Sequence, residues 1–241
     1  MTTTIYYIHD PMCSWCWAFR PALDALNERL PNHLQLDYLL GGLAKDTDEP
    51  MPEELRYQIQ NHWRTIQIRV PETKFNFEFW NKCHPRRSTY PACRAVLAAK
   101  TQDIKFEEPM IRAIQNAYYC QARNPSDTET LIELADEIDL DIERFTAELN
   151  SRQNRKLLNR EISFARQIGG NAFPMLLLGN DNAYHQILID YNHPDNMLKE
   201  ISQFLTYRSQ KGHGSSNRSH GGNGSSNRND GGHGSLTSSW K

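Results

Sequence analysis

The sequence predicts an α/β fold in which a long helical segment interrupts a small β-sheet. Three observations predict it. A short apolar run at residues 5–8 leads through a helical pattern into an alternating run at residues 33–42. Helical spacing then dominates from Pro52 to Ile168, and strand patterns return only at residues 175–189. The predicted order is therefore β-α-β, a helical insertion, and β-β-α.

The opening β-α-β unit follows from a change of hydrophobic period. Residues 5–8 (IYYI) form an apolar strand, and the segment WAFRPALDALNERL behind it has helical spacing, with Pro21 expected to bend it. Every second residue from Leu34 to Leu40 is apolar, which is strand periodicity. Two strands joined by one helix should pair in parallel with a right-handed crossover.

Helix boundaries in the middle of the chain are predicted from residues that typically begin, cap or end helices. Pro91 is suited to the first turn of a helix, and Asp127 and Asp141 are suited to capping two others. The last helix of the insertion should stop at residues 169–170, which are both glycine. Pro194 is placed to start a final helix.

These patterns divide the chain into three parts. Residues 1–48 and 169–208 should form one discontinuous domain, and residues 49–168 a helical insertion domain. Residues 209–241 are rich in Gly, Ser, Asn and His, and GSSNR occurs there twice. Such a segment cannot offset its ordering entropy by burial, so a disordered tail is expected.

Composition excludes several classes of protein. The 241 residues carry a net charge of −2, which gives no general attraction to nucleic acid. No apolar run approaches membrane-spanning length, and the first residues lack the pattern of a secretory signal. Five cysteines are few for a disulfide scaffold, and an odd number cannot all pair within one chain. A cytoplasmic protein with no membrane partner is expected.

The most informative motif is Cys-x-x-Cys at residues 13–16, between the first strand and the first helix. Two intervening residues in a first helical turn bring both sulfurs within bonding reach. Cys13 would meet unpaired backbone N–H groups and the positive end of the helix, which favour the nucleophilic thiolate. Cys16 would resolve the mixed disulfide. This arrangement is typical of a thioredoxin-like redox site. Half of a zinc site is the alternative, but no second Cys-x-x-Cys supplies the other ligands.

Phe173-Pro174 supplies the expected second half of the site. Proline is tolerated at the first residue of a strand, which is the plain interpretation. The functional interpretation is a cis-proline beside the cysteines. It would expose the Phe173 backbone for strand-like pairing with a substrate peptide.

Together these motifs resemble the DsbA family of disulfide oxidoreductases over about residues 4–208. CSWCW, the Gly pair after the second strand and RRSTYPACRAVLAAK resemble its cytosolic, FrnE-like branch of predicted protein-disulfide isomerases. The resemblance implies a thioredoxin-like fold with a helical insertion, Cys13 as nucleophile, Cys16 as resolving thiol and Pro174 as cis-proline. The neutral pair Ser14-Trp15 replaces the Pro-His pair of strongly oxidising relatives, which predicts a less oxidising disulfide.

Other residues leave alternatives open. His9 could shuttle protons or simply close the first strand, and Trp15 is expected to be exposed beside the sulfurs, with Trp17 in the core. Cys83 and Cys93 could form a second redox pair, or Cys93 could be a buried helix residue. The residues at 86–87, both arginine, could be a solvated pair or line a cleft for the carboxylates of glutathione.

The predicted function is a thiol–disulfide oxidoreductase (protein disulfide reductase or isomerase). Cys13 and Cys16 are its catalytic residues, and Ser14, Trp15, Phe173 and Pro174 bind its substrate. Its partners would be protein thiols and disulfides and a cellular thiol reductant, the thioredoxin or glutathione system. No metal or organic cofactor is expected beyond the Cys13–Cys16 disulfide, with glutathione as a candidate co-substrate. The alternatives are a glutathione-dependent enzyme resembling kappa-class transferases or hydroxychromene-carboxylate isomerases, and a non-enzymatic metal-binding or holdase protein.

Overall fold

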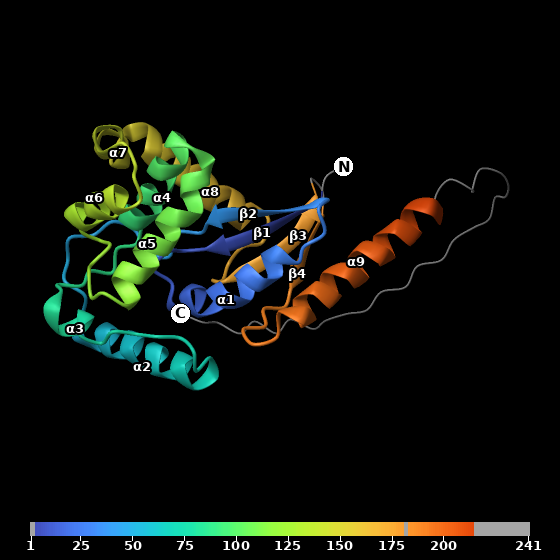
Figure 1. Cartoon of the computed structure of the whole chain (residues 1–241), viewed down its shortest axis with the longest axis horizontal. Helices are drawn as coiled ribbons and strands as arrows, with labels where there is room; N and C mark the ends of the chain where they lie inside the picture. The colour runs from blue at the N-terminus through green and yellow to red at the C-terminus, as the bar shows by residue number, and fades with distance from the viewer. Residues whose placement is uncertain (1–2, 181–182, 215–241) are drawn as a thin grey trace, which may run out of the picture. The chain divides into compact units, whose positions relative to one another are not determined.

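The computed structural model contains a mixed four-stranded sheet with strand order β2-β1-β3-β4 (Figure 1). The structure describes residues 3–180 and 183–214. The four strands are β1 (Thr3–His9), β2 (Leu34–Leu40), β3 (Met175–Asn180) and β4 (Ala183–Ile187). β1 pairs in parallel with β2 and antiparallel with β3, and β3 pairs antiparallel with β4. The parallel pairing predicted for the first two strands is confirmed. β4 ends two residues earlier than predicted.

Helix α1 (Ser14–Glu28) connects β1 to β2. Its buried face includes Cys16, Phe19, Leu23 and Leu26, spaced three or four residues apart, so it packs as an amphipathic helix. Pro21 lies inside the helix, as the sequence predicted. The carboxyl end of β1 therefore delivers the chain directly to the start of α1, where the two cysteines lie.

Seven α-helices lie between β2 and β3 within the described residues. They are α2 (Glu53–Arg69), α3 (Phe79–Lys82), α4 (Tyr90–Gln102), α5 (Glu107–Tyr119), α6 (Thr128–Glu137), α7 (Ile142–Leu149) and α8 (Arg152–Gln167), with a short 3-10 turn, η1 (Ile104–Phe106), before α5. The insertion is less continuous than the sequence predicted, because irregular segments separate α2 from α3, α3 from α4 and α5 from α6.

The predicted helix boundaries have mixed outcomes. Pro91 lies in the first turn of α4, and the Asp141 carboxylate caps α7 by accepting the Arg144 N–H at 2.9 Å. Gly169 ends α8 with a φ of +98°, a conformation that favours glycine. Asp127 occupies the N-cap position of α6, but its side chain makes no capping bond. That part of the prediction is wrong, because the Asp127 carboxylate binds the Arg86 guanidinium instead.

One apolar cluster spans elements on both sides of the predicted domain boundary. It joins Met12 and Leu40, near the cysteines, to Trp63 of α2 and to buried residues of α4, α5 and α8. Met12 and Leu40 are themselves almost fully buried. The helices of the insertion thus share a core with the segment that carries the cysteines.

The final helix, α9, runs from Pro194 to Gly214. It begins where the sequence predicted, but its last turns occupy the start of the predicted disordered tail. The rest of that tail, residues 215–241, lies outside the described residues. Contacts group residues 1–203 into one unit and the remaining residues into another. Among the described helices, none is both long and apolar enough to cross a membrane.

Candidate active site

Cys13 occupies the N-cap position of α1. The preceding loop folds tightly, because the Cys13 N–H donates to the Asp10 carbonyl at 3.0 Å and the Met12 N–H donates to the Asp10 carboxylate at 2.8 Å. Cys13 keeps an extended backbone, and its sulfur accepts the Cys16 N–H at 3.3 Å. A thiolate at this place would accept a free amide of the first helical turn and lie at the positive end of the helix.

Cys16 lies one turn deeper and has no exposed surface. Burial raises the pKa of its thiol well above the usual range, and the neighbouring Cys13 adds to that rise. Cys13 retains 7% of its surface. Both cysteines are free thiols in the structure. Cys13 therefore keeps a little exposed surface, whereas Cys16 keeps none.

Phe173 and Pro174 lie against Cys13 although they are far away in sequence. The peptide bond between them is cis. The Cys13 thiol lies 3.8 Å from the Phe173 carbonyl oxygen. The structure thus brings together the two halves of the site that the sequence singled out.

Gly41 makes this approach of Phe173 possible. A Cβ atom at Gly41 would lie 1.8 Å from a carbon of the Phe173 ring, so the ring covers the glycine directly. The Gly41 N–H donates to the His9 carbonyl at 2.8 Å, which ties the loop after β2 to the end of β1. A cavity of about 420 Å³ opens beside this contact. Its lining residues are Gly41, Gly42, Leu43, Arg166, Gly169, Gly170, Asn171 and Phe173.

The two tryptophans beside Cys16 are both half-buried, which differs from the prediction of one exposed and one core residue. The Trp15 ring meets the Tyr191 ring edge-on at 5.4 Å, and the Arg69 guanidinium lies over it at 5.8 Å. Trp17 stacks on Tyr119 and donates its indole N–H to the Lys74 carbonyl at 3.0 Å. The neighbouring Ser14 is half-buried as well. Two aromatic pairs, Trp15 with Tyr191 and Trp17 with Tyr119, therefore lie next to Cys16.

Asp10 is the main feature of the site that the sequence did not reveal. Its carboxylate is fully buried, which raises its pKa. Besides the Met12 N–H, it accepts the Leu43 N–H at 2.7 Å, the Thr89 hydroxyl at 2.6 Å and the Cys93 thiol at 3.5 Å. Asp10 thereby joins the loop before Cys13, the loop after β2 and the start of α4. The signal available in the sequence was an aspartate three residues before Cys13.

His9 closes β1 and is also fully buried. Both ring nitrogens lack a hydrogen-bond partner within the described part of the chain. Its ring stacks on Tyr7 at 5.0 Å and meets Tyr38 edge-on. Burial, with a smaller contribution from Arg20, lowers the pKa of His9 to about 3. His9 does end β1, as the second of its two interpretations predicted, but it does so as a neutral ring buried in the core.

The other cysteines have separate surroundings. Cys83 donates to the Ala122 carbonyl at 3.1 Å, while Cys93 is buried against Asp10. Burial raises the pKa of both thiols. These separate partners favour the buried-helix interpretation of Cys93 over a second redox pair. Arg86 is not a solvated residue, because its guanidinium binds the Ser126 carbonyl and the Asp127 carboxylate.

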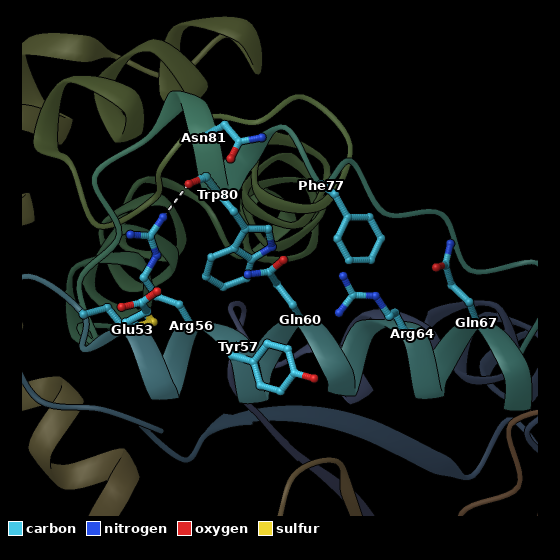
Figure 2. A pocket seen from close by; sticks show the side chains of 10 residues that line it. Glu53, Arg56, Tyr57, Gln60, Arg64, Gln67, Phe77, Trp80 and Asn81 are labelled. Carbon is cyan, nitrogen blue, oxygen red and sulfur yellow. Dashed lines mark hydrogen bonds between the residues drawn. The ribbon is translucent and has the colours of Figure 1, made fainter.

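The described part of the chain holds no metal cluster, but it does hold a large cavity away from the cysteines. Among residues 3–180 and 183–214, no three His, Cys, Asp or Glu side chains gather as metal ligands. A cavity of about 710 Å³ lies between α2 and residues 77–81 (Figure 2). Tyr57, Gln60 and Arg64 project from α2 on one side, and Phe77 and Trp80 lie on the other. Its lining contains no cysteine and one carboxylate residue, Glu53.

A Cys-x-x-Cys pair at the start of a helix, beside a cis-proline that leads into a neighbouring strand of a mixed sheet, defines a thioredoxin-like protein. The family model described as thioredoxin matches residues 6–199. The chain belongs to this family.

Solved structures agree with this assignment. A protein from Nitrosomonas europaea, provisionally identified as a protein disulfide isomerase, is similar with a TM-score of 0.75 and 26% identity. The match covers 86% of this chain and 99% of that one. The cytosolic disulfide reductase DsbM from Pseudomonas aeruginosa is similar with a TM-score of 0.68 and 23% identity, over 85% of this chain and 99% of that one. The resemblance to DsbA-like proteins with a thioredoxin-like fold is thus confirmed.

A curated relative has a different kind of name. The ClpXP adapter protein SpxH of Bacillus subtilis is 24% identical over 176 residues, which is 73% of this chain. The match covers 58% of the length of SpxH, so a large part of that protein has no counterpart in the alignment.

Proposed function

We propose that this chain is a thiol–disulfide oxidoreductase that acts on protein substrates through a mixed disulfide at Cys13. The observation that carries the proposal is the position of the Cys13 sulfur, which accepts the Cys16 N–H at 3.3 Å and lies 3.8 Å from the Phe173 carbonyl. This geometry supports Cys13 as the nucleophile, Cys16 as the resolving thiol and the Phe173 backbone as the peptide-binding edge.

Reduction of a substrate would proceed in two exchanges. The Cys13 thiolate attacks one sulfur of the substrate disulfide, forming a Cys13–substrate bond and releasing the other sulfur as a thiolate that takes a proton from water. Cys16 then gives its proton to solvent and attacks the Cys13 sulfur. The Cys13–Cys16 disulfide forms, and the substrate leaves with both sulfurs reduced. Two electrons pass from the protein to the substrate.

Four neighbouring residues would hold the substrate during these steps. The Phe173 carbonyl, fixed by Pro174, would accept an N–H of the substrate backbone, as in strand addition. Ser14 and Trp15 lie between the two cysteines, and the half-buried Trp15 ring would contact side chains near the substrate sulfur. No metal or organic cofactor takes part in this chemistry.

A cellular thiol reductant would regenerate the dithiol. DsbM has been crystallised with glutathione, which supports glutathione as a co-substrate here. DsbM is also described as cytosolic, which supports a cytoplasmic location, where a thiol pool can keep Cys13 and Cys16 reduced. In that setting reduction or isomerisation is favoured over net oxidation.

An adapter role is the second candidate, because the curated relatives are ClpXP adapters. Such a role would need a protein-binding surface but no thiol chemistry. The two candidates differ in their dependence on Cys13.

An assay of insulin reduction and of scrambled-ribonuclease reactivation separates them. We expect Cys13→Ser to abolish both activities and Cys16→Ser to abolish insulin reduction, because the mixed disulfide can no longer be resolved. Cys120→Ser is the matched control, since it removes a half-buried thiol outside the site. Equal activity in the wild type and both site variants would contradict the oxidoreductase and leave the adapter.

A further inference from the structure

The exposed face of α8 is strongly basic although the whole chain has a net charge of −2. Five exposed cations lie on this helix: Arg152, Arg155, Lys156, Arg160 and Arg166. The helix has one acidic residue, Glu161, which turns inward and accepts the Leu40 N–H at 3.0 Å. No exposed carboxylate on α8 therefore offsets the positive charge of its outer face.

Most of this charge is unpaired. Arg155 lies 3.7 Å from the Asp46 carboxylate. The other four cations form no ion pair with any carboxylate in residues 3–180 and 183–214. Elsewhere in the chain arginines do pair, as the exposed Arg112 and the half-buried Arg123 each do with two carboxylates. The positive electrostatic field of α8 is thus available to attract an anionic ligand.

One edge of this basic face borders the redox site. Arg166 lines the cavity of about 420 Å³ whose wall includes Phe173, the residue in contact with Cys13. One turn earlier, the Ile162 side chain packs under Gly42, where a Cβ atom would lie 2.4 Å from it. The cavity therefore lies between α8 and the loop that follows β2.

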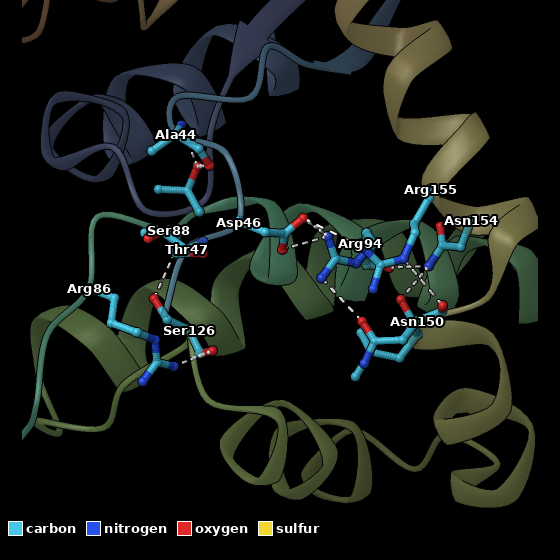
Figure 3. A network of polar contacts seen from close by, with 12 residues as sticks. Ala44, Asp46, Thr47, Arg86, Ser88, Arg94, Ser126, Asn150, Asn154 and Arg155 are labelled. Atoms are coloured by element: carbon cyan, nitrogen blue, oxygen red, sulfur yellow. Dashed lines mark hydrogen bonds and ion pairs between the residues drawn. The ribbon is translucent and has the colours of Figure 1, made fainter. Parts of the chain in front are cut away.

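A second cavity continues the first along α8. It has a volume of about 360 Å³ and is lined by Lys45, Asp46, Tyr90, Arg94, Arg155, Leu158 and Asn159. The Tyr90 ring, which lines the second cavity, lies against Gly42, which lines the first, with 2.8 Å to a Cβ placed there. Asp46 is the one carboxylate of the lining, and Figure 3 shows it bound to Arg94, with Arg155 beside it.

The two cavities are thus neighbours along α8. Phe173 and Arg166 line the first, and Lys45 and Arg155 line the second. Arg155 and Arg166 are separated by about 16 Å along the helix axis. An extended peptide covers that distance in about five residues. We propose that the two cavities act as one groove, which we call the α8 groove, and that it binds an acidic segment that flanks the reactive cysteine of a protein substrate. The proposal rests on the proposed function of Cys13.

Stopped-flow reduction of model peptides by the reduced protein tests the proposal. Each peptide carries one cysteine as a mixed disulfide with 2-mercaptoethanol, followed by four glutamates, four glutamines or four lysines. A fourth peptide has its glutamates before the cysteine. We expect the wild type to reduce one of the two glutamate peptides about fivefold faster than the glutamine peptide, because two or three surface ion pairs form. The lysine peptide should be reduced more slowly than the glutamine peptide.

Two double variants and one single variant locate the effect. Lys45→Gln/Arg166→Gln removes two cations that line the groove, and we expect the preference for glutamate to fall to about twofold or less. Lys156→Gln/Arg160→Gln removes two cations from the same helix that line neither cavity. Lys199→Gln removes an exposed cation from α9. Both control variants should keep the preference for glutamate.

The outcomes separate this proposal from the proposed function. If the wild type reduces none of the peptides, the oxidoreductase itself fails. If it reduces all of them at one rate, or if glutamates before and after the cysteine act equally, the acidic-segment proposal is overturned. Equal loss of preference in the groove variant and in Lys156→Gln/Arg160→Gln would assign the effect to the general field of α8 and would also overturn the groove.

Discussion

Asp10 has the contacts of a positioning residue rather than of a proton acceptor for Cys16. Both of its carboxylate oxygens are engaged, one by the Met12 N–H and the other by Leu43, Thr89 and Cys93. The burial of an acid costs free energy unless donors surround it, and these four donors supply that compensation. Asp10 therefore fixes the loop that presents Cys13.

The Thr89 hydroxyl allows this role to be tested without touching the site. Thr89→Val keeps the shape of the side chain but removes one donor to Asp10, while Thr89→Ser keeps the hydroxyl. We expect the rate of Cys13 alkylation by iodoacetamide at pH 7 to fall severalfold in Thr89→Val and to recover in Thr89→Ser, because the loop loosens. A lower melting temperature with unchanged alkylation would show that Thr89 is only structural.

His9 should make stability depend on pH. Its pKa is about 3 in the folded chain and 6.5 in the unfolded chain, so the unfolded chain binds more protons between these values. Stability is therefore full above pH 6.5 and is lost as the pH falls toward 3. Between pH 7.5 and pH 5 the loss from His9 alone is about 2 kcal/mol.

Urea unfolding of wild type and His9→Phe at both pH values measures this loss. Phenylalanine keeps the ring contacts with Tyr7 and Tyr38 but cannot titrate. The pH-dependent fall should be about 2 kcal/mol smaller in the variant, and other titrating groups cancel in the difference. An equal fall in both proteins would mean that His9 gains its proton in the folded state.

At the scale of elements, the contact between Gly41 and the Phe173 ring sets one wall of the site. Gly41→Ala should push this ring aside, at a cost of about 1–3 kcal/mol for overpacking. The same substitution in a Phe173→Ala background should cost much less, because the clash is gone. Denaturant unfolding of the four proteins of this cycle gives the coupling, and additive effects would show that the two residues act independently.

The elements that the sequence predicted well are those with a clear local signal. The period change around residues 5–40, the proline in the first turn of α4 and the glycine that ends α8 depend on nearby residues alone. Asp127 failed as a cap because Arg86, 41 residues earlier in the chain, competes for its carboxylate. Asp10 was missed for the same reason, since three of its four donors come from after β2 or from the region of α4.

At the scale of the whole molecule, the helices between β2 and β3 contribute to the site itself. α4 lies next to Asp10 through Thr89 and Cys93, and Met12 and Leu40 share an apolar cluster with Trp63. We infer that the sheet and these helices depend on each other for stability, although the sequence suggests two domains.

Equilibrium unfolding in urea tests this dependence. Because the cluster joins both regions, we expect far-ultraviolet circular dichroism and tryptophan fluorescence to report one coincident transition. Replacing residues 49–168 by a short linker should leave a chain that does not fold. Two separate transitions, or a folded chain without the helices, would contradict the shared core.

The central claim is that Cys13 forms a mixed disulfide with substrates, and trapping that bond tests it most directly. In Cys16→Ser the resolving thiol is missing, so the mixed disulfide should persist. After incubation with an oxidised protein substrate and acid quenching, mass spectrometry of the digested complex should find the substrate bonded to Cys13. Bonding to Cys83 or Cys120 instead would contradict the claim. So would the absence of a mixed disulfide in Cys16→Ser under conditions in which the wild type reduces the same substrate.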